Sequence, residues 1–92
     1  MKQDRVIITV LGKDSVGIIA KVCNHLAGAR INILDISQTI VQGYFNMMMI
    51  VDMTDSLKPF GEVADELSQI GEEIGVLVKC QREEIFEKMH RV

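Results

Sequence analysis

The sequence predicts an α+β domain with the ferredoxin-like βαββαβ order, in which an antiparallel sheet carries two helices on one face and a short C-terminal helix follows. Three observations predict this fold: a short β-branched run opens the chain, two later segments repeat apolar residues at helical spacing, and three segments alternate apolar and polar residues. The chain has 92 residues, 48% of them hydrophobic and 25% charged, which is typical of one folded domain. We expect residues 1–92 to form a single domain with its core at about 5–81.

The first strand and the first helix are joined by a turn bounded by glycines. The run RVIITVL at residues 5–11 is short and β-branched, which favours a buried strand. The segment GKDSVG at 12–17 has capping residue types between its two glycines, so we expect a tight strand-to-helix turn. The apolar residues that follow recur at helical spacing and predict an amphipathic helix: Ile18, Ile19, Val22, Cys23, Leu26 and Ala29.

A β-hairpin is expected next. Residues 31–41 alternate, with Leu34, Ile36 and Ile40 on one face. Gln42 and Gly43 form a two-residue turn. Residues 44–51 then form the partner strand, whose apolar face consists of Phe45, Met47, Met49 and Val51.

The rest of the chain predicts a helix, a strand and a final helix. Residues 58–74 have helical periodicity, with Pro59 near the start and Gly75 placed to end the helix in the left-handed conformation. Residues 76–81 alternate and predict the last strand. Residues 83–91 read as a short amphipathic helix with acidic residues at its start and basic residues at its end.

One face of this sheet is more apolar than a solvated face usually is. The residues expected to face the helices are Val6, Ile8, Val10, Leu34, Ile36, Phe45, Met47 and Met49. The opposite face still carries Ile7, Leu11, Met48 and Ile50. We expect either the C-terminal helix or a second subunit to cover it.

Composition excludes several partners. The chain has 10 Lys and Arg against 13 Asp and Glu, a net charge of −3, and its basic residues are scattered, so we expect no direct binding of nucleic acid. Aromatic residues total 4%, too few for base stacking on a sheet. The apolar run at 6–11 is too short for a signal sequence or a membrane span. We expect a soluble cytoplasmic protein.

We find no group of residues that predicts catalysis or metal binding. The turn at 12–17 has no cysteine, so it lacks the soft ligands of a metal-transfer domain. Its cation is Lys13, whereas phosphate-ester or acylphosphate chemistry would use an arginine to clamp the anion. Ser15 has no evident base or orienting acid. We therefore expect no enzyme activity, no cofactor and no bound metal.

Isolated residues with reactive side chains have simpler interpretations. Cys23 and Cys80 form no CxxC pair and are expected to be small buried residues. His25 and His90 are expected on solvated helix surface. The middle residue of the run at 47–49 points to the opposite face from its neighbours, so these methionines do not converge on one metal ion.

The turn at 12–17 is the one candidate binding site. Its backbone N–H groups at a helix start favour a carboxylate, and Asp14 is suited to an ammonium, so together they suit a zwitterionic amino acid. The alternative is that Asp14 or Ser15 only caps the helix and the glycines only shape the turn.

The segment VIITVLGKDSVGIIAKVCNHLAGARINILDISQTI resembles an ACT domain. The resemblance rests on the apolar strand, the Asp-x-x-Gly-Ile turn at 14–18, the Leu-Ala helix and the Ile-Asn-Ile that opens the next strand, and it extends to Val78. The chain is similar in particular to stand-alone single-ACT proteins and, more distantly, to the halves of the glycine-cleavage transcriptional repressor.

The resemblance implies a regulatory module of amino-acid metabolism that forms homodimers and binds an amino acid or similar metabolite between subunits. Its ligand would modulate a partner enzyme or transcription regulator; a structural or protein-interaction module without a small ligand is the alternative. The implied ligand-binding residues are Gly12, Lys13, Asp14 and Gly17 in the turn of one chain, facing Asn32 and Ile33 of a neighbour.

One position departs from the ACT pattern. These domains commonly have glycine before Ile-Asn-Ile, where the helix ends in the left-handed conformation, and this chain has Arg30. Either the helix ends differently or Arg30 carries modest backbone strain.

Overall fold

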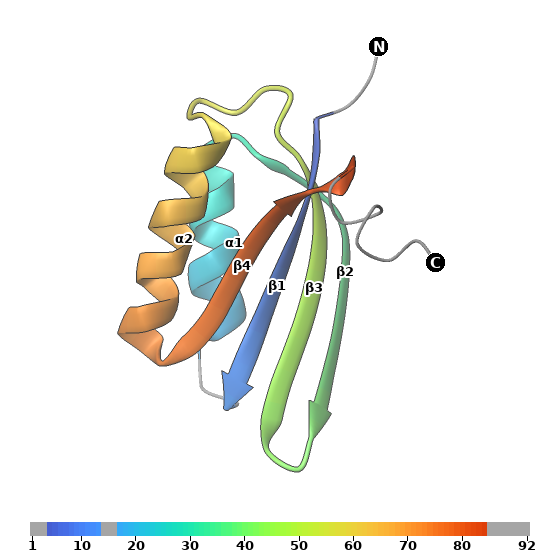
Figure 1. The fold of residues 1–92 in the computed structure, drawn as a ribbon, viewed down its shortest axis with the longest axis vertical. Coiled ribbons are helices and arrows are strands. Elements are labelled where there is room, and N and C mark those ends of the chain that lie inside the picture. The colour runs from blue at the N-terminus through green and yellow to red at the C-terminus, as the bar shows by residue number, and fades with distance from the viewer. Residues whose placement is uncertain (1–3, 14–16, 85–92) are drawn as a thin grey trace.

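The computed structural model describes residues 4–13 and 17–84. Over these residues the elements follow the order βαββαβ (Figure 1). They are β1 (Arg5–Lys13), α1 (Ile18–Gly28), β2 (Asn32–Val41), β3 (Tyr44–Asp52), α2 (Phe60–Ile74) and β4 (Val76–Arg82). The predicted ferredoxin-like fold class is confirmed.

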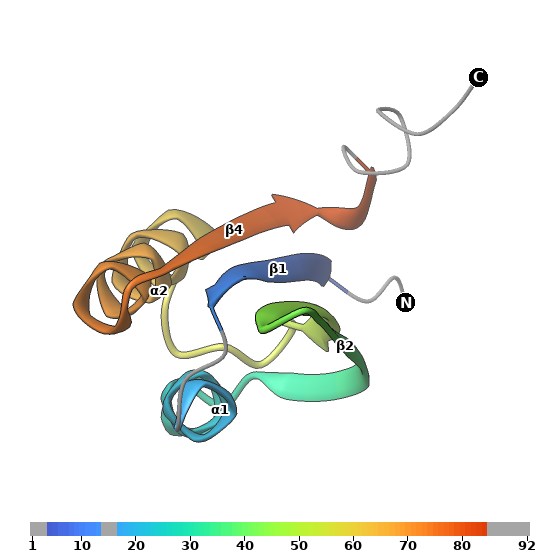
Figure 2. The same cartoon turned by 90° about the horizontal axis from the view of Figure 1, so that it is seen from below.

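The strands form one antiparallel sheet in the order β2-β3-β1-β4, so β1 and β3 are central and β2 and β4 are edges. Seen along the sheet, α1 and α2 lie side by side on the same face (Figure 2). The buried apolar residues of β3 alternate with exposed or half-buried ones, as expected for a sheet covered on one face, whereas Val6, Ile7 and Ile8 of β1 are buried in succession. The core between sheet and helices includes Val6, Ile8, Val10, Ile18, Val22, Leu26, Phe45, Met47, Met49, Val51, Val63, Leu67, Val76 and Val78.

Left-handed backbone ends three of the elements. Arg30 has φ 61° just after α1, and the Ile31 N–H donates to the Leu26 carbonyl, so the helix ends as it would with glycine and Arg30 carries the strain. Gln42 and Gly43, with φ 51° and 83°, form the predicted hairpin turn. Gly75, with φ 80°, ends α2 as predicted.

Two glycines are required by close packing. A Cβ on Gly71 would lie 2.7 Å from the Val76 carbonyl oxygen and 2.8 Å from Val78 Cγ2, so α2 packs directly on β4 there. A Cβ on Gly12 would lie 2.8 Å from Val76 Cγ1. Gly71 lies in the predicted helix 58–74, where glycine normally disfavours a helix, and this packing is the physical reason for its presence.

Some sequence-based boundaries were wrong. Gly12 and Lys13 extend β1 by pairing with Phe45 and Tyr44 and do not belong to the turn. The second strand begins at Asn32, one residue later than predicted, and β3 continues to Asp52. α2 begins at Phe60 with Pro59 as its N-cap, because proline has no N–H to donate and its extended backbone leads into the first turn.

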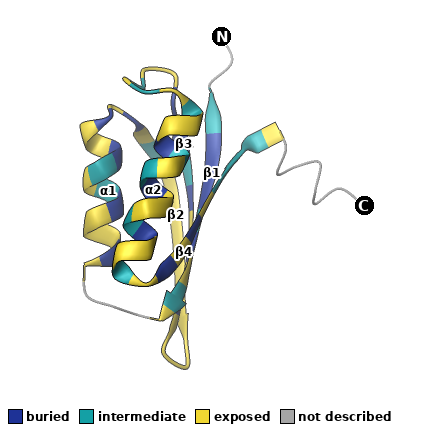
Figure 3. Cartoon of the chain, turned by 60° about the vertical axis from the view of Figure 1, so that its left-hand side comes forward, coloured by how far each residue is buried: buried dark blue, intermediate teal, exposed yellow. Residues whose placement is uncertain are grey.

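The prediction that Leu34 and Ile36 are covered by the helices was also wrong. They are 39% and 40% exposed, and β2 is exposed along almost its whole length (Figure 3). Ile36 pairs with the buried Met49 and so lies on the helix-facing side, but β2 is an edge strand beyond the area that the helices cover. A β-bulge between Ile33 and Asp35 also interrupts the simple alternation on which the prediction depended.

The predicted C-terminal helix lies mostly outside the described residues. Glu83 and Glu84 are helical, and 85–91 are not described. On the sheet face turned away from α1 and α2, Leu11 and Met48 are 52% and 38% exposed and Ile50 is half-buried, whereas Ile7 is buried at 6%. The expectation of an exposed apolar face therefore holds for part of it.

Candidate functional site

The predicted turn lies where β1 ends and α1 begins. Gly12 and Lys13 are the last residues of β1, and Lys13 is exposed. Gly17 is the N-cap of α1 and has φ 88°, a conformation that glycine adopts without strain. The Lys21 N–H donates to the Gly17 carbonyl at 2.9 Å. Because the N–H groups before Lys21 have no acceptor within the helix, this end of α1 is suited to an anion.

Asp14 and Ser15 lie outside the described residues, so the structure does not test the role of Asp14. The alternative interpretation of the turn at 12–17 was that Asp14 or Ser15 caps the helix. The N-cap residue is Gly17, and no side chain caps the described part of the helix start.

Asn32 and Ile33 lie at the opposite end of the sheet. Asn32 is the exposed first residue of β2 and pairs with Asp52, the last residue of β3, whereas Lys13 pairs with Tyr44, the first residue of β3. At about 3.4 Å per residue, the length of β3 separates the two ends by roughly 27 Å. The structure thus brings Gly12, Lys13 and Gly17 together and does not bring them near Asn32 or Ile33 of the same chain.

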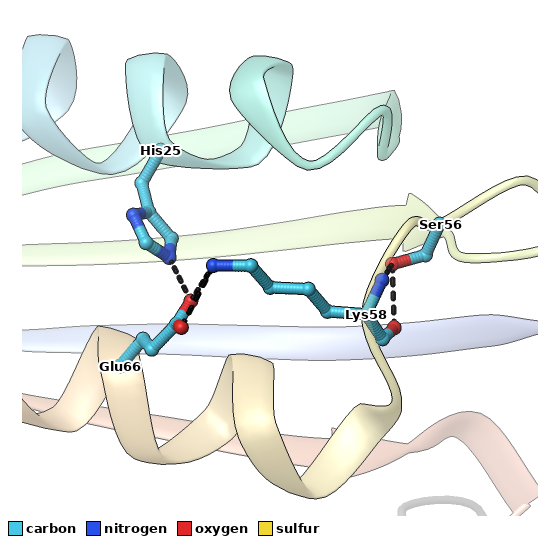
Figure 4. A network of polar contacts seen from close by, with 4 residues as sticks. All are labelled: His25, Ser56, Lys58 and Glu66. Atoms are coloured by element: carbon cyan, nitrogen blue, oxygen red, sulfur yellow. Dashed lines mark hydrogen bonds and ion pairs between the residues drawn. The ribbon is translucent and has the colours of Figure 1, made fainter.

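A second polar cluster joins α1, α2 and the segment before α2, and sequence reasoning missed it. Glu66 of α2 binds His25 of α1 through Oε1, with 2.7 Å to the ring Nε2 (Figure 4). Lys58 Nζ donates to both Glu66 oxygens, at 3.0 and 2.8 Å. Ser56 Oγ donates to the Lys58 carbonyl at 2.7 Å and accepts from its N–H at 3.2 Å. Because an ionised carboxylate only accepts, the proton in the His25 bond is on Nε2.

The electrostatics of this cluster follow from its geometry. Hydrogen bonds from Lys58 and then from His25 hold the pKa of Glu66 below its ordinary value. The same Glu66 bond raises the pKa of Lys58. The arrangement links the two helices, and a carboxylate that accepts hydrogen bonds from both Lys58 and His25 is a poor proton acceptor for catalysis.

The expectation that His25 is solvated was therefore wrong, since its side chain is 24% exposed and paired. Forty-one positions separate it from Glu66 in the chain, so no local spacing predicts the contact. The sequence shows that the helix at 58–74 contains acidic residues. It does not show which of them faces His25, because that depends on how the two helices pack.

The cysteines fit their predicted role as thiols of the domain interior. Cys23 and Cys80 are free and partly buried against the core. Burial raises the pKa of the Cys80 thiol to about 11. Within residues 4–13 and 17–84, no three His, Cys, Asp or Glu side chains come together as metal ligands. Over the same residues, no helix has both the length and the apolar character to cross a membrane.

Comparison with known proteins identifies the family. The family model described as ACT domain matches residues 4–81. The chain belongs to the ACT domain family. The resemblance inferred from the sequence is thereby confirmed, and ACT domains as a class are regulatory modules that bind small ligands.

Relatives of this ACT domain include single-domain proteins of similar length. It is 57% identical over 89 residues to the UPF0237 protein of Bifidobacterium longum, with 97% of this chain and 99% of that protein covered. The solved structure of an ACT domain protein from Streptococcus pneumoniae is similar, at 38% identity and a TM-score of 0.80, covering 94% of this chain and 97% of that one. The regulatory subunit of aspartate kinase from Thermus thermophilus matches at 26% identity and a TM-score of 0.65, over 87% of this chain and 52% of that one.

Proposed function

We propose that this ACT domain binds an amino acid between two copies of the chain and that occupancy regulates a partner enzyme or transcription regulator. One observation carries the proposal. The implied ligand residues divide into a group at the β1–α1 end and a group at the start of β2, and about 27 Å separates the two within one chain. A single small ligand therefore contacts both groups only if a second copy supplies one of them.

The edge strand β2 supports such a pairing. It has ten residues, contains Asp35 as its one charged residue, and leaves a row of backbone N–H and C=O groups at the sheet edge. Long edge strands with few charges tend to pair with another chain. If two β2 strands pair antiparallel about a twofold axis, Asn32 of one copy lies beside Val41 of the other. Val41 pairs with Tyr44, which pairs with Lys13, so this is the β1–α1 end.

The chemistry of these two groups suits a zwitterion. The start of α1 favours a carboxylate through its N–H groups. Asp14 would hold the ammonium, and the Asn32 amide both donates and accepts hydrogen bonds. The regulatory role is supported by the similarity to the regulatory subunit of aspartate kinase, a protein whose role is regulation of another subunit.

A thermal-shift screen of the twenty common amino acids tests whether there is a ligand. A ligand at a hundred times its dissociation constant stabilises a protein by about 2.7 kcal/mol, and each kcal/mol raises the melting midpoint of a domain this small by roughly 4–8 °C. We expect at least one amino acid to give such a shift, and Asp14→Ala to abolish it. If Asp14 only caps the helix, Asp14→Ala would lower the stability by about 1 kcal/mol and leave the ligand-induced shift unchanged.

Mixing two variants tests whether the site is shared between chains. Asp14→Ala and Asn32→Ala each damage every site of a homodimer. In a mixed dimer, one site combines both changes and the other is intact, so an equimolar, fully exchanged mixture should regain about a quarter of the binding capacity. Equilibrium dialysis measures that capacity. No recovery after verified subunit exchange would contradict a shared site.

The alternative function is a protein-interaction module without a small ligand. The exposed apolar residues on the sheet face turned away from the helices favour this alternative. A screen in which no amino acid changes the melting midpoint would support it.

A further inference from the structure

The sheet face turned away from α1 and α2 has an apolar centre. On this face, Leu11 of β1 pairs with Leu77 of β4, and these side chains are 52% and 57% exposed. Tyr44 and Met48 of β3 extend the apolar surface, at 57% and 38% exposed. We call these four residues the far-face cluster. Contiguous apolar residues on a sheet face mark an interaction surface more often than a solvated one.

The two edges of the same face carry opposite charges. Lys79 is exposed on β4, and its row across the sheet runs through Thr9 and Met48 to Ser37 of β2. Asp35 is exposed on β2, two residues before Ser37. The acid and the base therefore lie on opposite edges and are offset by about 7 Å along the strands. Leu11 and Met48 lie on the two central strands between these edges.

We propose that a second copy of this chain packs face to face on the far-face cluster. A twofold axis that runs parallel to the strands exchanges the edges, so the β4 edge of one copy meets the β2 edge of the other. Lys79 then lies near Asp35 of the second copy, and the pair occurs twice. Two uncharged or like-charged edges would give no such self-complementarity. The aligned packing of two sheets, with strands crossing at about 30°, brings opposed side chains into one layer.

The size of the face bounds the strength of this contact. Four strands about 4.8 Å apart and about nine residues long present a face of roughly 570 Å². Because Ile7 on this face is buried and Ile50 is half-buried, two copies bury less than about 1,100 Å², which is the size of a weak, reversible contact. This contact uses a sheet face, whereas the pairing in the proposed function uses the β2 edge, and each can exist without the other.

Sedimentation equilibrium of the full chain and two variants tests the contact. Leu77→Lys places a charge in the far-face cluster, and Leu57→Lys is the matched control, since Leu57 is 65% exposed and precedes α2. We expect Leu77→Lys to lower the average mass toward half that of the parent at the same concentration, and Leu57→Lys to match the parent. A monomeric parent, or equal masses for the two variants, would overturn the proposal. Circular dichroism establishes that both variants are folded.

Charge reversal tests the orientation of the two copies. We expect Lys79→Asp and Asp35→Lys each to raise the dissociation constant by up to about 30-fold, because each change breaks both copies of the pair and one exposed ion pair contributes up to about 1 kcal/mol. The double variant should restore the parent value, because the pair is re-formed with its signs exchanged. A double variant no tighter than the singles would overturn the face-to-face arrangement.

Discussion

The His25 ring Nε2 lies 2.7 Å from Glu66 Oε1, and this contact links α1 to α2. Lys58 binds the same carboxylate, so one acid connects two helices and the segment that precedes α2. Glu66 is thus the residue on which the polar contacts between the helices depend.

Glu66→Gln should make stability less dependent on pH in acid. Because the pKa of Glu66 is lower in the folded than in the unfolded chain, its contribution is full above the ordinary value of 4.5 and is lost as pH falls through the folded value. Lys58 has a raised pKa, so its contribution is full below 10.5 and is lost as pH rises through the folded value. We expect Glu66→Gln to be less stable than the parent near neutral pH, with the difference shrinking below pH 4.5. Urea unfolding between pH 3 and 8 measures it.

The matched control is Glu72→Gln, since Glu72 is an exposed acid on the same helix. Its stability difference from the parent should be small at every pH. A difference for Glu66→Gln that stays constant across this pH range would contradict the role given to Glu66.

Gly71→Ala should destabilise the domain, and Gly61→Ala should stabilise it slightly. The new methyl group at 71 would meet the Val76 carbonyl at 2.7 Å, and overpacking costs about 1–3 kcal/mol. At 61 a Cβ meets nothing within 4 Å, so alanine should gain about 0.5–1 kcal/mol from its helix propensity. Thermal unfolding of both variants measures the difference. Equal effects would mean that α2 does not pack on β4 as closely as described.

Arg30→Gly should stabilise the domain by about 0.5–1 kcal/mol. The left-handed conformation costs an ordinary residue roughly 1–2 kcal/mol, and the greater flexibility of glycine in the unfolded chain offsets part of the gain. Arg30→Ala is the control, because alanine retains the strain and should give no such gain. Chemical denaturation measures both free energies of unfolding. A gain from alanine equal to that from glycine would show that the arginine side chain, and not its backbone, is unfavourable.

The Cys80 thiol should react slowly with iodoacetamide in the folded chain. Its pKa of about 11, against an ordinary 9.0, reduces the thiolate fraction at pH 8 by roughly 100-fold. The rate should continue to rise with pH up to about 11, and the stability that the buried neutral thiol contributes should be lost between pH 9.0 and 11. Peptide mass spectrometry follows Cys80 itself, with the urea-unfolded chain as the reference. Equal rates in folded and unfolded chains would contradict the burial of this thiol.

Particular residues show how far sequence reasoning reaches into the fold. The apolar face of β3, the hairpin turn at Gln42 and the helix end at Gly75 were predicted, because each depends on residues that are close in the chain. Leu34 and Ile36 were misplaced because the bulge and the edge position of β2 depend on its partner strand and on the reach of the helices.

For the candidate site, the sequence indicated the residues and not their distances. The residues of the β1–α1 turn are neighbours in the chain, so their grouping follows from local sequence. The register of β1, β2 and β3 sets the separation of Asn32 from this turn, and that register depends on hydrogen bonds between distant segments.

By itself the sequence determined the order of the elements and which face of the central strands is buried, because periods of 2 and 3.6 residues are local properties of the chain. The tertiary structure decided what lies across space. It placed Gly71 against Val76, paired His25 with Glu66, and set Lys79 and Asp35 on opposite edges of the far face. Each of these contacts or placements depends on how separate elements pack together, which no local pattern encodes.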